Sequence, residues 1–339
     1  MSKFARVVVT AVLFAFVPPA FAWGPDGHRV VGSVADQLLT DNAKQQIAAI
    51  VGVDLRTAGP WLDCVKSVQR QADGSLAYVV NPAFEPPCTP FANDHAAMID
   101  YVARNWIDCV YPEGVVDETK NRGCHQTYHF DDVAIQRDRF DRNYAGTNDH
   151  DLVAATNAAM AVLLGRPAPP PFSIKDKKEA LFMLAHLVGD MTQPLHVGAL
   201  YLDEKGALAD PDVSHTIDPS TETAGANLIF DGTTAFHSEW DGIPKDLGDT
   251  APPELVATAK ALPLDHGRME NWAATWASDT ILVAQEALIG TSYVKSGDGK
   301  WSVSFTDRVA YDRAADAIKR KQLAKAGARL AEIMNTIWP

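Results

Sequence analysis

Helical periodicity dominates the pattern of hydrophobic and polar positions along this chain. Its clearest instance lies at 173–196, where the residues that recur at helical spacing are Ile174, Ala180, Leu181, Leu184, Leu187 and Val188. Ser173 offers an oxygen to cap the start, and Pro194 ends or kinks the helix. His186 and Asp190, four residues apart, project from one face and are spaced as metal ligands, the alternative being a polar helix end that faces water.

Further segments repeat this helical pattern. They are 28–51, with a break near residues 40–41, and 94–106, 149–164, 254–289 and 307–338. Residues 67–93 and 202–224 are rich in turn formers and predict irregular structure, whereas 227–236 resembles a short extended stretch. Period-two alternation around residues 297–299 predicts a small β-hairpin. No composition shift marks a boundary, so residues 23–339 are expected to form a single, mainly α domain.

The first 22 residues have the pattern of a secretory signal peptide. Lys3 and Arg6 precede an apolar run, and the small-residue motif Ala20-Phe21-Ala22 resembles a cleavage site. The apolar run is too short to span a membrane as a helix, and no later run is long enough. We therefore expect export to the periplasm or the medium, no membrane association, and a mature chain that begins at Trp23.

Charge and cysteine content narrow the function classes. The formal net charge of −13 excludes a protein held on duplex nucleic acid by a basic surface, but it is compatible with several bound divalent cations. Four cysteines in an oxidising compartment favour two disulfides over a thiolate metal site. Of the three pairings, Cys64–Cys88 with Cys109–Cys124 closes the shortest loops and is preferred.

Five of the ten histidines lie near carboxylates at spacings that suit metal binding: His28, His129, His186, His196 and His237. Asp241 follows His237 by four residues, repeating the spacing of the first pair. Nitrogen and carboxylate ligands without thiolate suit Zn²⁺ at sites that keep a position open for water. Each histidine alone could equally be a hydrogen-bonded structural residue, which is the preferred interpretation of His95, His125, His150, His215 and His266. A free amino group on Trp23 would add a further metal ligand.

In order and spacing, several motifs together resemble the zinc-dependent single-strand-specific nucleases, the S-one/P-one family within the phospholipase C/nuclease superfamily. These motifs are WGPDGH at 23–28, WLD at 61–63, HFDD at 129–132, HLVGDMTQPLH at 186–196, GAN at 225–227 and HSEWD at 237–241. The resemblance implies a helical bundle of the phospholipase C/zinc nuclease type with three zinc ions per chain. It also implies hydrolysis of RNA and single-stranded DNA to 5′-nucleotides, together with 3′-nucleotidase activity.

The resemblance assigns nine metal ligands to three sites. The first site would comprise Asp63, His129, His186 and Asp190, and the second would comprise Trp23, His28 and the shared Asp190. The third would comprise His196, His237 and Asp241. Bound zinc lowers the pKa of water towards about 7 and neutralises charge at phosphorus, which phosphodiester hydrolysis requires.

The resemblance also indicates residues that act on substrate. Asp132 matches a carboxylate that orients the attacking water, although it could simply cap a turn. Lys66 stands where the family often has an arginine that supports the transition state. Phe130 and Leu202 match an apolar slot for an unpaired base, unless they are ordinary core residues, and Asn227 completes the substrate site.

One departure from the family and two rival functions remain. Ala226 replaces a glycine of the family's Gly-Gly-Asn motif, which puts the conformation near Asn227 in question. The nearest rival is a zinc phospholipase C, which usually has Glu where this chain has Asp241. A rival of another class is a non-catalytic periplasmic zinc-binding protein, although His-rich tracts are absent. The expected partners are single-stranded nucleic acid and nucleotides, and a monomer is assumed because no oligomer signal is present.

Overall fold

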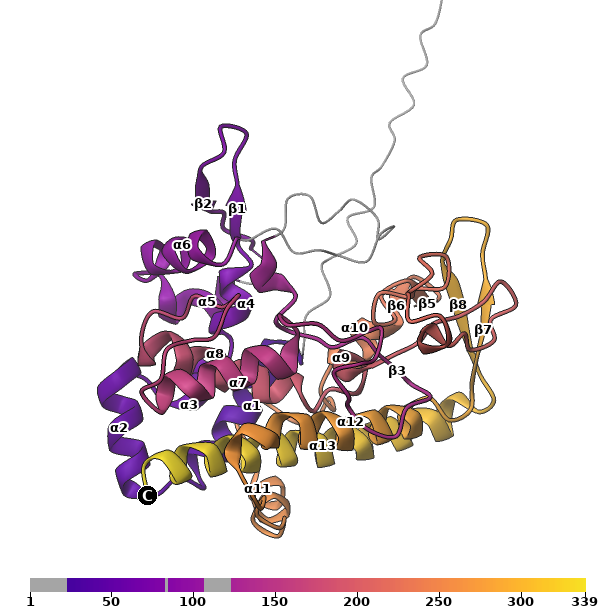
Figure 1. Cartoon of the computed structure of the whole chain (residues 1–339). Coiled ribbons are helices and arrows are strands. Elements are labelled where there is room, and N and C mark those ends of the chain that lie inside the picture. The colour runs from indigo at the N-terminus through magenta and orange to yellow at the C-terminus, as the bar shows by residue number, and fades with distance from the viewer. Residues whose placement is uncertain (1–22, 83–84, 107–122) are drawn as a thin grey trace, which may run out of the picture.

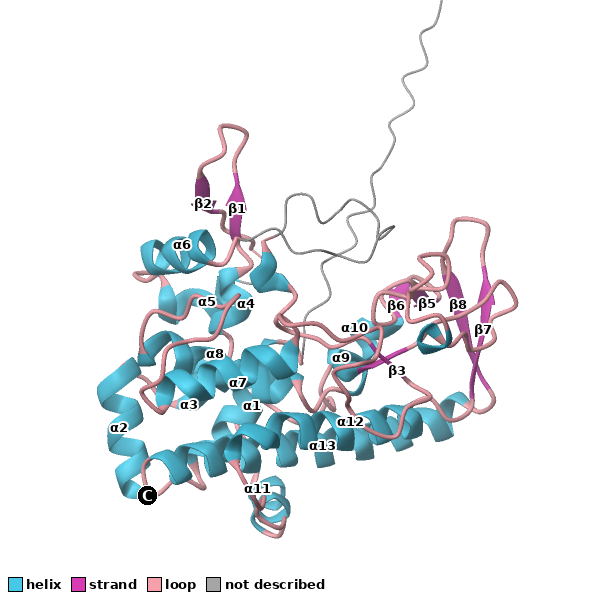
Figure 2. Ribbon diagram, in the orientation of Figure 1, coloured by secondary structure: helices cyan, strands magenta, loops and turns pink. Residues whose placement is uncertain are grey.

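The computed structural model describes residues 23–82, 85–106 and 123–339, and the chain is mainly helical, as predicted (Figure 1). The signal sequence predicted at residues 1–22 lies outside the described residues. Helices fill most of the molecule, and most of the strands lie at one end or in one projecting hairpin (Figure 2). The longest helix, α13 (Arg308–Ile337), runs along one side of the whole assembly.

The remaining elements follow in chain order. The other α-helices are α1 (Pro25–Asp36), α2 (Asp41–Val51), α3 (Leu55–Ala58), α4 (Trp61–Val65), α5 (Glu85–Cys88), α6 (His95–Arg104), α7 (Leu152–Leu163), α8 (Lys177–Asp190), α9 (Pro194–Val197), α10 (Phe236–Asp241), α11 (Pro253–Lys260) and α12 (Trp272–Ala287). The strands are β1 (Val68–Arg70), β2 (Leu76–Tyr78), β3 (Val133–Ala134), β4 (Gly198–Ala199), β5 (Ile229–Asp231), β6 (Thr234–Ala235), β7 (Thr291–Lys295) and β8 (Trp301–Phe305). Short 3-10 helices cover Thr89–Phe91, Cys124–Gln126, Pro211–Val213 and Met269–Asn271.

Helix α8 lies at the centre of the fold. It packs against α7, α1, α2, α4 and α13, and every residue from Glu179 to Asp190 is buried. A helix that is apolar almost all round is stable only when other elements cover it. The two polar ligand candidates at its C-terminal end are therefore held inside the protein rather than presented to bulk water.

The start of α8 differs from the prediction. Asp176, not Ser173, is the N-cap, and its carboxylate accepts the Glu179 backbone N–H at 3.0 Å. Ser173 instead exchanges hydrogen bonds with the Asn105 side chain through its backbone N and O, at 3.0 and 3.1 Å. The segment before α8 is therefore tied to the end of α6, a contact distant in sequence.

Local signals located the break between the first two helices, although α1 begins at Pro25, three residues before the predicted start. The predicted break near residues 40–41 is confirmed, because α1 ends at Asp36 and α2 begins at Asp41. Thr40 caps α2 by accepting the Ala43 backbone N–H at 3.1 Å, and Gly52 ends the helix with a φ of 74°.

The C-terminal half holds one correction. The pattern at 254–289 predicted a single helix, but α11 ends at Lys260 and α12 begins at Trp272. Pro263 and the positive φ of Gly267 interrupt the helix between them. The last helical segment is confirmed as α13, which packs against α1, α8, α11 and α12. None of the described helices is both long and apolar enough to cross a membrane.

The predicted hairpin is confirmed, with β7 and β8 antiparallel, and it belongs to a larger sheet. Strand order is β6-β5-β8-β7, and β5 pairs with β8 in parallel, joining segments about 70 residues apart in sequence. The stretch at 67–93, predicted to be irregular, contains a second hairpin, β1–β2, and α5. These strands have three residues each, too short for alternation to be recognised.

One predicted disulfide is confirmed. Cys64 of α4 is bonded to Cys88 of α5, a separation of 24 residues. Cys124 is also disulfide-bonded, whereas Cys109, its expected partner, lies outside the described residues. The Cys64–Cys88 bond ties the excursion at 67–93 back to the helix that carries Asp63.

Candidate metal centre

Five helices and the segment before β3 bring eight side-chain ligand candidates together at the C-terminal end of α8. His28 comes from α1, Asp63 from α4, His186 and Asp190 from α8, His196 from α9, and His237 and Asp241 from α10. His129 precedes β3, which pairs in parallel with β4 directly after α9. This pairing, distant in sequence, is what brings His129 beside His196. All eight side chains are buried.

The first group surrounds Asp190. Its Oδ2 lies 3.0 Å from His129 Nδ1 and 3.3 Å from His186 Nε2, and the two ring nitrogens are 3.0 Å apart. Asp63 Oδ1 lies 3.7 Å from the same His186 Nε2. Trp61 stacks on Phe182 of α8, with ring centroids 5.0 Å apart, and so fixes the helical turn that carries Asp63. These four donors converge on one small space.

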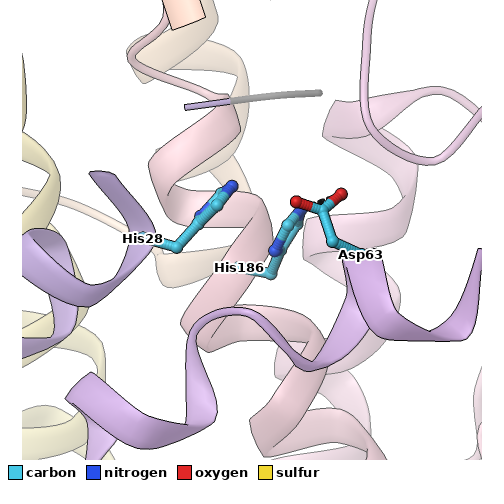
Figure 3. Close-up of side chains that lie close together, drawn as sticks. All are labelled: His28, Asp63 and His186. Atoms are coloured by element: carbon cyan, nitrogen blue, oxygen red, sulfur yellow. Dashed lines mark ion pairs between the residues drawn. The ribbon is translucent and has the colours of Figure 1, made fainter. Parts of the chain in front are cut away.

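His28 joins this group from the opposite side. Its ring stacks on His186 with centroids 3.6 Å apart, and its Nε2 lies 3.4 Å from Asp190 Oδ1. Figure 3 shows His28, His186 and Asp63 projecting from three helices, with the three side chains lying next to one another. The two oxygens of Asp190 therefore face different histidines, which is the arrangement a bridging carboxylate needs.

The third group comprises His196, His237 and Asp241. The Nε2 atoms of the two histidines are 3.2 Å apart, and they lie 3.8 and 3.5 Å from Asp241 Oδ1. His237 and Asp241 are one turn apart on α10, the spacing noted in the sequence. The three groups thus share one buried region rather than three separate places.

Trp23 is fully buried at the edge of this region. Its indole Nε1 donates to Thr192 Oγ1 at 3.3 Å, and the next backbone N–H, of Gly24, donates to the Asp241 carbonyl at 2.9 Å. The backbone at residue 23 is therefore held next to a residue that carries a ligand carboxylate. Cleavage before Trp23 would place an amino group there.

Backbone carbonyls orient three of the rings. The Nδ1 atoms of His186, His196 and His237 lie 2.8, 2.7 and 2.5 Å from the carbonyls of Gly59, His129 and Gly225. A proton on each Nδ1 leaves Nε2 unprotonated and aimed at the metal space, as in known metal sites. Gly225 and Ala226 both have positive φ, 59° and 70°. The substitution noted at Ala226 therefore places a methyl group in a strained left-handed conformation.

The protonation states of four of the five histidines suit cation binding, whereas for His186 the lowering effect of burial is outweighed by Asp190 and Asp63, which raise its pKa. Burial lowers the pKa of His28, His129 and His196 well below the ordinary range, and lowers that of His237 to about 4. These imidazoles are therefore neutral at neutral pH, the form that ligates metal. Burial raises the pKa of Asp190 to about 6, which a divalent cation beside the carboxylate would reverse.

Several of the donor atoms also lack a hydrogen-bond partner within the described protein. The buried atoms without a hydrogen bond include His28 Nδ1 and Nε2, His129 Nε2, Asp63 Oδ2, Asp190 Oδ1 and Asp241 Oδ2. Leaving such atoms unsatisfied costs about 1–3 kcal/mol each, so their concentration in one region calls for a ligand. Nitrogen and oxygen donors in groups of three fit divalent zinc. The residues present therefore fit the metal that the family resemblance implies.

The predicted substrate residues occupy different environments. Burial, with a contribution from Glu222, raises the pKa of Asp132 to about 8, and the Tyr201 hydroxyl donates to the Asp132 carbonyl at 2.8 Å. Lys66 Nζ donates to Asp63 Oδ1 at 2.8 Å, so a positive charge adjoins the metal centre. Phe130 is half-buried two residues before Asp132.

Two other predicted substrate residues serve the fold in this conformation. Leu202 is fully buried and packs in the cluster that also contains Leu195 and Trp240, so its side chain offers no surface to a base. The Asn227 amide donates to the Ala224 carbonyl at 2.8 Å and stabilises the turn that holds the Gly225 carbonyl under His237.

Sequence reasoning missed one residue that contacts a ligand. The buried Gln193 side chain donates to Asp241 Oδ1 at 2.7 Å, while its own oxygen accepts the Leu195 backbone N–H at 2.6 Å. The signal available was its place between Asp190 and His196 in a metal-binding motif. Its contact to α10 depends on the tertiary fold.

Comparison with known proteins identifies the family of this chain. The model of the family described as S1/P1 Nuclease matches residues 107–339, more than half of the chain. Nuclease PA3 of Penicillium sp and nuclease P1 of Penicillium citrinum are each 30% identical to the chain over 196 residues. This match covers 53% of the chain and 65% of each relative, slightly less than two thirds of their length. With a matching family model and three buried His/Asp groups, the chain belongs to the S1/P1 nuclease family.

Proposed function

We propose that this protein is a zinc-dependent hydrolase of phosphodiester bonds that cleaves RNA and single-stranded DNA to 5′-nucleotides and removes 3′-phosphates from nucleotides. The observation that carries the proposal is the set of three buried His/Asp groups that share one region, in a chain of the S1/P1 nuclease family. A phosphodiester is anionic and has a poor leaving group, so its hydrolysis needs concentrated positive charge at the reacting phosphorus.

Nine residues would hold three zinc ions. Asp63, His129 and His186 would hold the first with Asp190, and Asp190 would also serve the second with His28 and the amino and carbonyl groups of Trp23. His196, His237 and Asp241 would hold the third. The short distances from Asp190 to three histidines support its bridging role.

Bound zinc supplies activated water near neutral pH and neutralises charge on the phosphoryl group. Three zinc ions in the neighbouring ligand groups would favour the carboxylate form of Asp132 over the protonated form, and this carboxylate would accept a hydrogen bond from the attacking water and orient it towards phosphorus. The Lys66 ammonium, already 2.8 Å from Asp63, would attract the non-bridging oxygens as a point charge. Because Lys lacks the planar fork of Arg, it would position the phosphate less strictly.

Single-strand preference follows from Phe130. The aromatic ring of Phe130, the residue that follows His129 in the chain, would stack one unpaired base, which contributes about 1–3 kcal/mol and tolerates any base. A paired base is already stacked in its duplex and cannot enter. Leu202 would support this slot from within the core, and Asn227 would hold the neighbouring turn.

Two alternatives make different predictions. A zinc phospholipase C shares this type of site, but the relatives matched here are nucleases, and Asp241 stands where those lipases usually have Glu. A non-catalytic zinc-binding protein would need the ligands but not Asp132. The proposal also includes export through residues 1–22, cleavage before Trp23, and a monomeric mature protein.

The test combines substrate choice with one substitution. The chain beginning at Trp23 would be given single-stranded DNA, RNA or phosphatidylcholine vesicles, each with chelator and then with zinc restored. We expect 5′-mononucleotides, lost with chelator and recovered with zinc. Asp132→Asn should lower kcat by about 10²–10⁴-fold because a positioned proton acceptor is lost.

Metal content separates catalysis from folding. Asp132→Asn should keep three zinc ions per chain, and the exposed Asp138→Asn, six residues along, should match the wild type in both assays. If the protein releases phosphocholine and leaves nucleic acid intact, the phospholipase C alternative is correct. Zinc binding without turnover of any substrate would favour the non-catalytic alternative.

A further inference from the structure

One face of the C-terminal helix reaches the metal centre, although no motif in the sequence pointed there. Lys319 and Gln322, three residues apart on α13, lie on the same side of the helix. Lys319 is 8% exposed and Gln322 is fully buried. Buried Lys and Gln side chains are costly unless their polar groups are satisfied, so their contacts indicate what they do.

Lys319 holds the end of α10. Its ammonium donates to the carbonyls of Glu239 and Gly242, both at 2.6 Å, and lies 5.5 Å from the centre of the Trp240 ring. These two carbonyls flank Asp241 in the chain. The ammonium therefore clamps the backbone on either side of a ligand carboxylate without touching the carboxylate itself.

Helix α10 needs such support. It has six residues, too few to be stable alone, yet it carries both His237 and Asp241. The carbonyls at its C-terminal end have no partners within the helix, and a cation there is favourable to the helix dipole. Lys319 provides both a donor and a positive charge at this point.

Gln322 supports the adjoining loop. Its amide donates to the Thr192 carbonyl at 2.8 Å, in the turn between α8 and α9. The Thr192 hydroxyl donates to the Gly189 carbonyl and accepts from the Trp23 indole. One turn of α13 thus contacts both segments that converge on Asp241.

We propose that Lys319 is a positioning residue for the third metal group, formed by His196, His237 and Asp241, with Gln322 in a supporting role. The ammonium fixes the C-terminal end of α10 so that Asp241 and His237 meet His196 at metal-binding distance. This inference deepens the proposed function and rests on it, because it requires that the three groups bind zinc.

The test measures zinc binding rather than turnover. Lys319→Met keeps the length and apolar stem but removes all three donors. Residues that support metal ligands typically change affinity by about 10–100-fold, so we expect one of three zinc ions to bind that much more weakly, with the other two unchanged. Stepwise affinities would come from competition with a zinc-binding indicator, and stoichiometry from elemental analysis.

Lys325→Met is the matched control. Lys325 lies on the same helix and is partly buried, but its ammonium faces Asp279 of α12 at 3.9 Å, away from the metal groups. It should bind three zinc ions with wild-type affinities even if its stability falls. If Lys319→Met does not fold, Lys319→Gln replaces it in the comparison with Lys325→Met. Because Gln retains hydrogen-bond donors at the site, the expected loss of zinc affinity is smaller.

A double variant identifies the affected group. In an Asp241→Asn background the third group is already impaired, so adding Lys319→Met should weaken the third zinc ion little further and leave the other two unchanged. If Lys319→Met binds three zinc ions as tightly as Lys325→Met does, the inference is overturned and the proposed function stands. The same holds if Lys319→Met weakens all three sites equally. A wild-type protein that binds no zinc would overturn both.

Discussion

At the scale of single residues, His125 shows how burial changes the response to pH. The side chain is fully buried between Tyr101 and Trp106, and neither ring nitrogen has a hydrogen-bond partner in the part of the chain that is described. Burial, with a smaller contribution from Lys66, lowers its pKa to about 3 from an ordinary value of 6.5. The folded state therefore keeps His125 neutral over a range in which the unfolded chain takes up a proton.

The sign of this effect is destabilising in acid. Between pH 6.5 and 3 the unfolded state binds one proton more at this residue, so stability falls as pH falls through that range. At pH 5 the loss from His125 is about 2 kcal/mol relative to pH 7. We expect His125→Phe to remove this contribution to the loss of stability in acid. Urea unfolding at both pH values, with chelator present, would measure the free energy of unfolding of each protein. Parallel losses in wild type and variant would contradict the pKa shift.

Single residues also show what spacing can and cannot predict. The His/Asp pairs on α8 and α10 were predictable because residues four apart share a helix face. Which of the ten histidines would converge was not a matter of spacing, since His28, His129 and His186 come from three distant segments. Leu202 illustrates the opposite case, because an apolar residue near a motif can belong to a slot or to the core, and only packing decides.

At the scale of elements, the contact of α1 with α3 depends on Gly32. A Cβ at this position would lie 2.3 Å from the Leu55 carbonyl oxygen and 2.5 Å from the Arg56 nitrogen. Both atoms are backbone, so neither can move aside as a flexible side chain could. Helix α1 therefore approaches α3 only because residue 32 lacks a side chain, and this approach helps to set the position of His28, one turn earlier.

Gly32→Ala should therefore destabilise the protein. In an open helix the change would be favourable by up to about 1 kcal/mol, but here overpacking should cost about 1–3 kcal/mol. Urea unfolding would measure the loss. Gly248→Ala is the control, because nothing lies within 4 Å of a Cβ there. A Gly32 variant as stable as the wild type would show that α3 shifts without cost.

Elements with strong local signals were predicted, and those without were not. Caps and breakers are local in sequence, which is why α2 begins and ends where Thr40 and Gly52 indicate. The β1–β2 hairpin was missed because its strands are short and lie among turn residues. The prediction that Ser173 caps α8 was wrong because Ser173 is hydrogen-bonded to Asn105 at the end of α6. The local sequence pattern gives no sign of this distant contact.

At the scale of the whole molecule, the proposal joins export to activity through Trp23. This residue is fully buried, and its neighbour Gly24 donates to the Asp241 carbonyl, so the chain end would be held at the metal centre after cleavage. A free α-amino group has an ordinary pKa near 8 and binds metal when neutral, whereas an amide nitrogen does not.

A single Ala added before Trp23 should therefore abolish one ligand. We expect this variant to bind two zinc ions tightly and the third weakly, with reduced nuclease activity, when compared with a chain that begins at Trp23. A chain with the same Ala added after Pro339 controls for the extension itself. If both extended chains bind three zinc ions with full affinity, the amino group of Trp23 is not a metal ligand.

The sequence by itself determined the mainly helical class and the amphipathic segments, and it favoured the Cys64–Cys88 pairing and the candidate ligands, because these depend on periodicity, composition and spacing within short windows. Only the tertiary structure decided that the ligand candidates share one buried region, that Leu202 is core, and that Lys319 supports α10. Those outcomes depend on contacts between residues up to hundreds of positions apart, such as the α1–α13 packing and the parallel β3–β4 pairing. Local pattern carries no information about such contacts, because packing free energy is a property of the assembled chain.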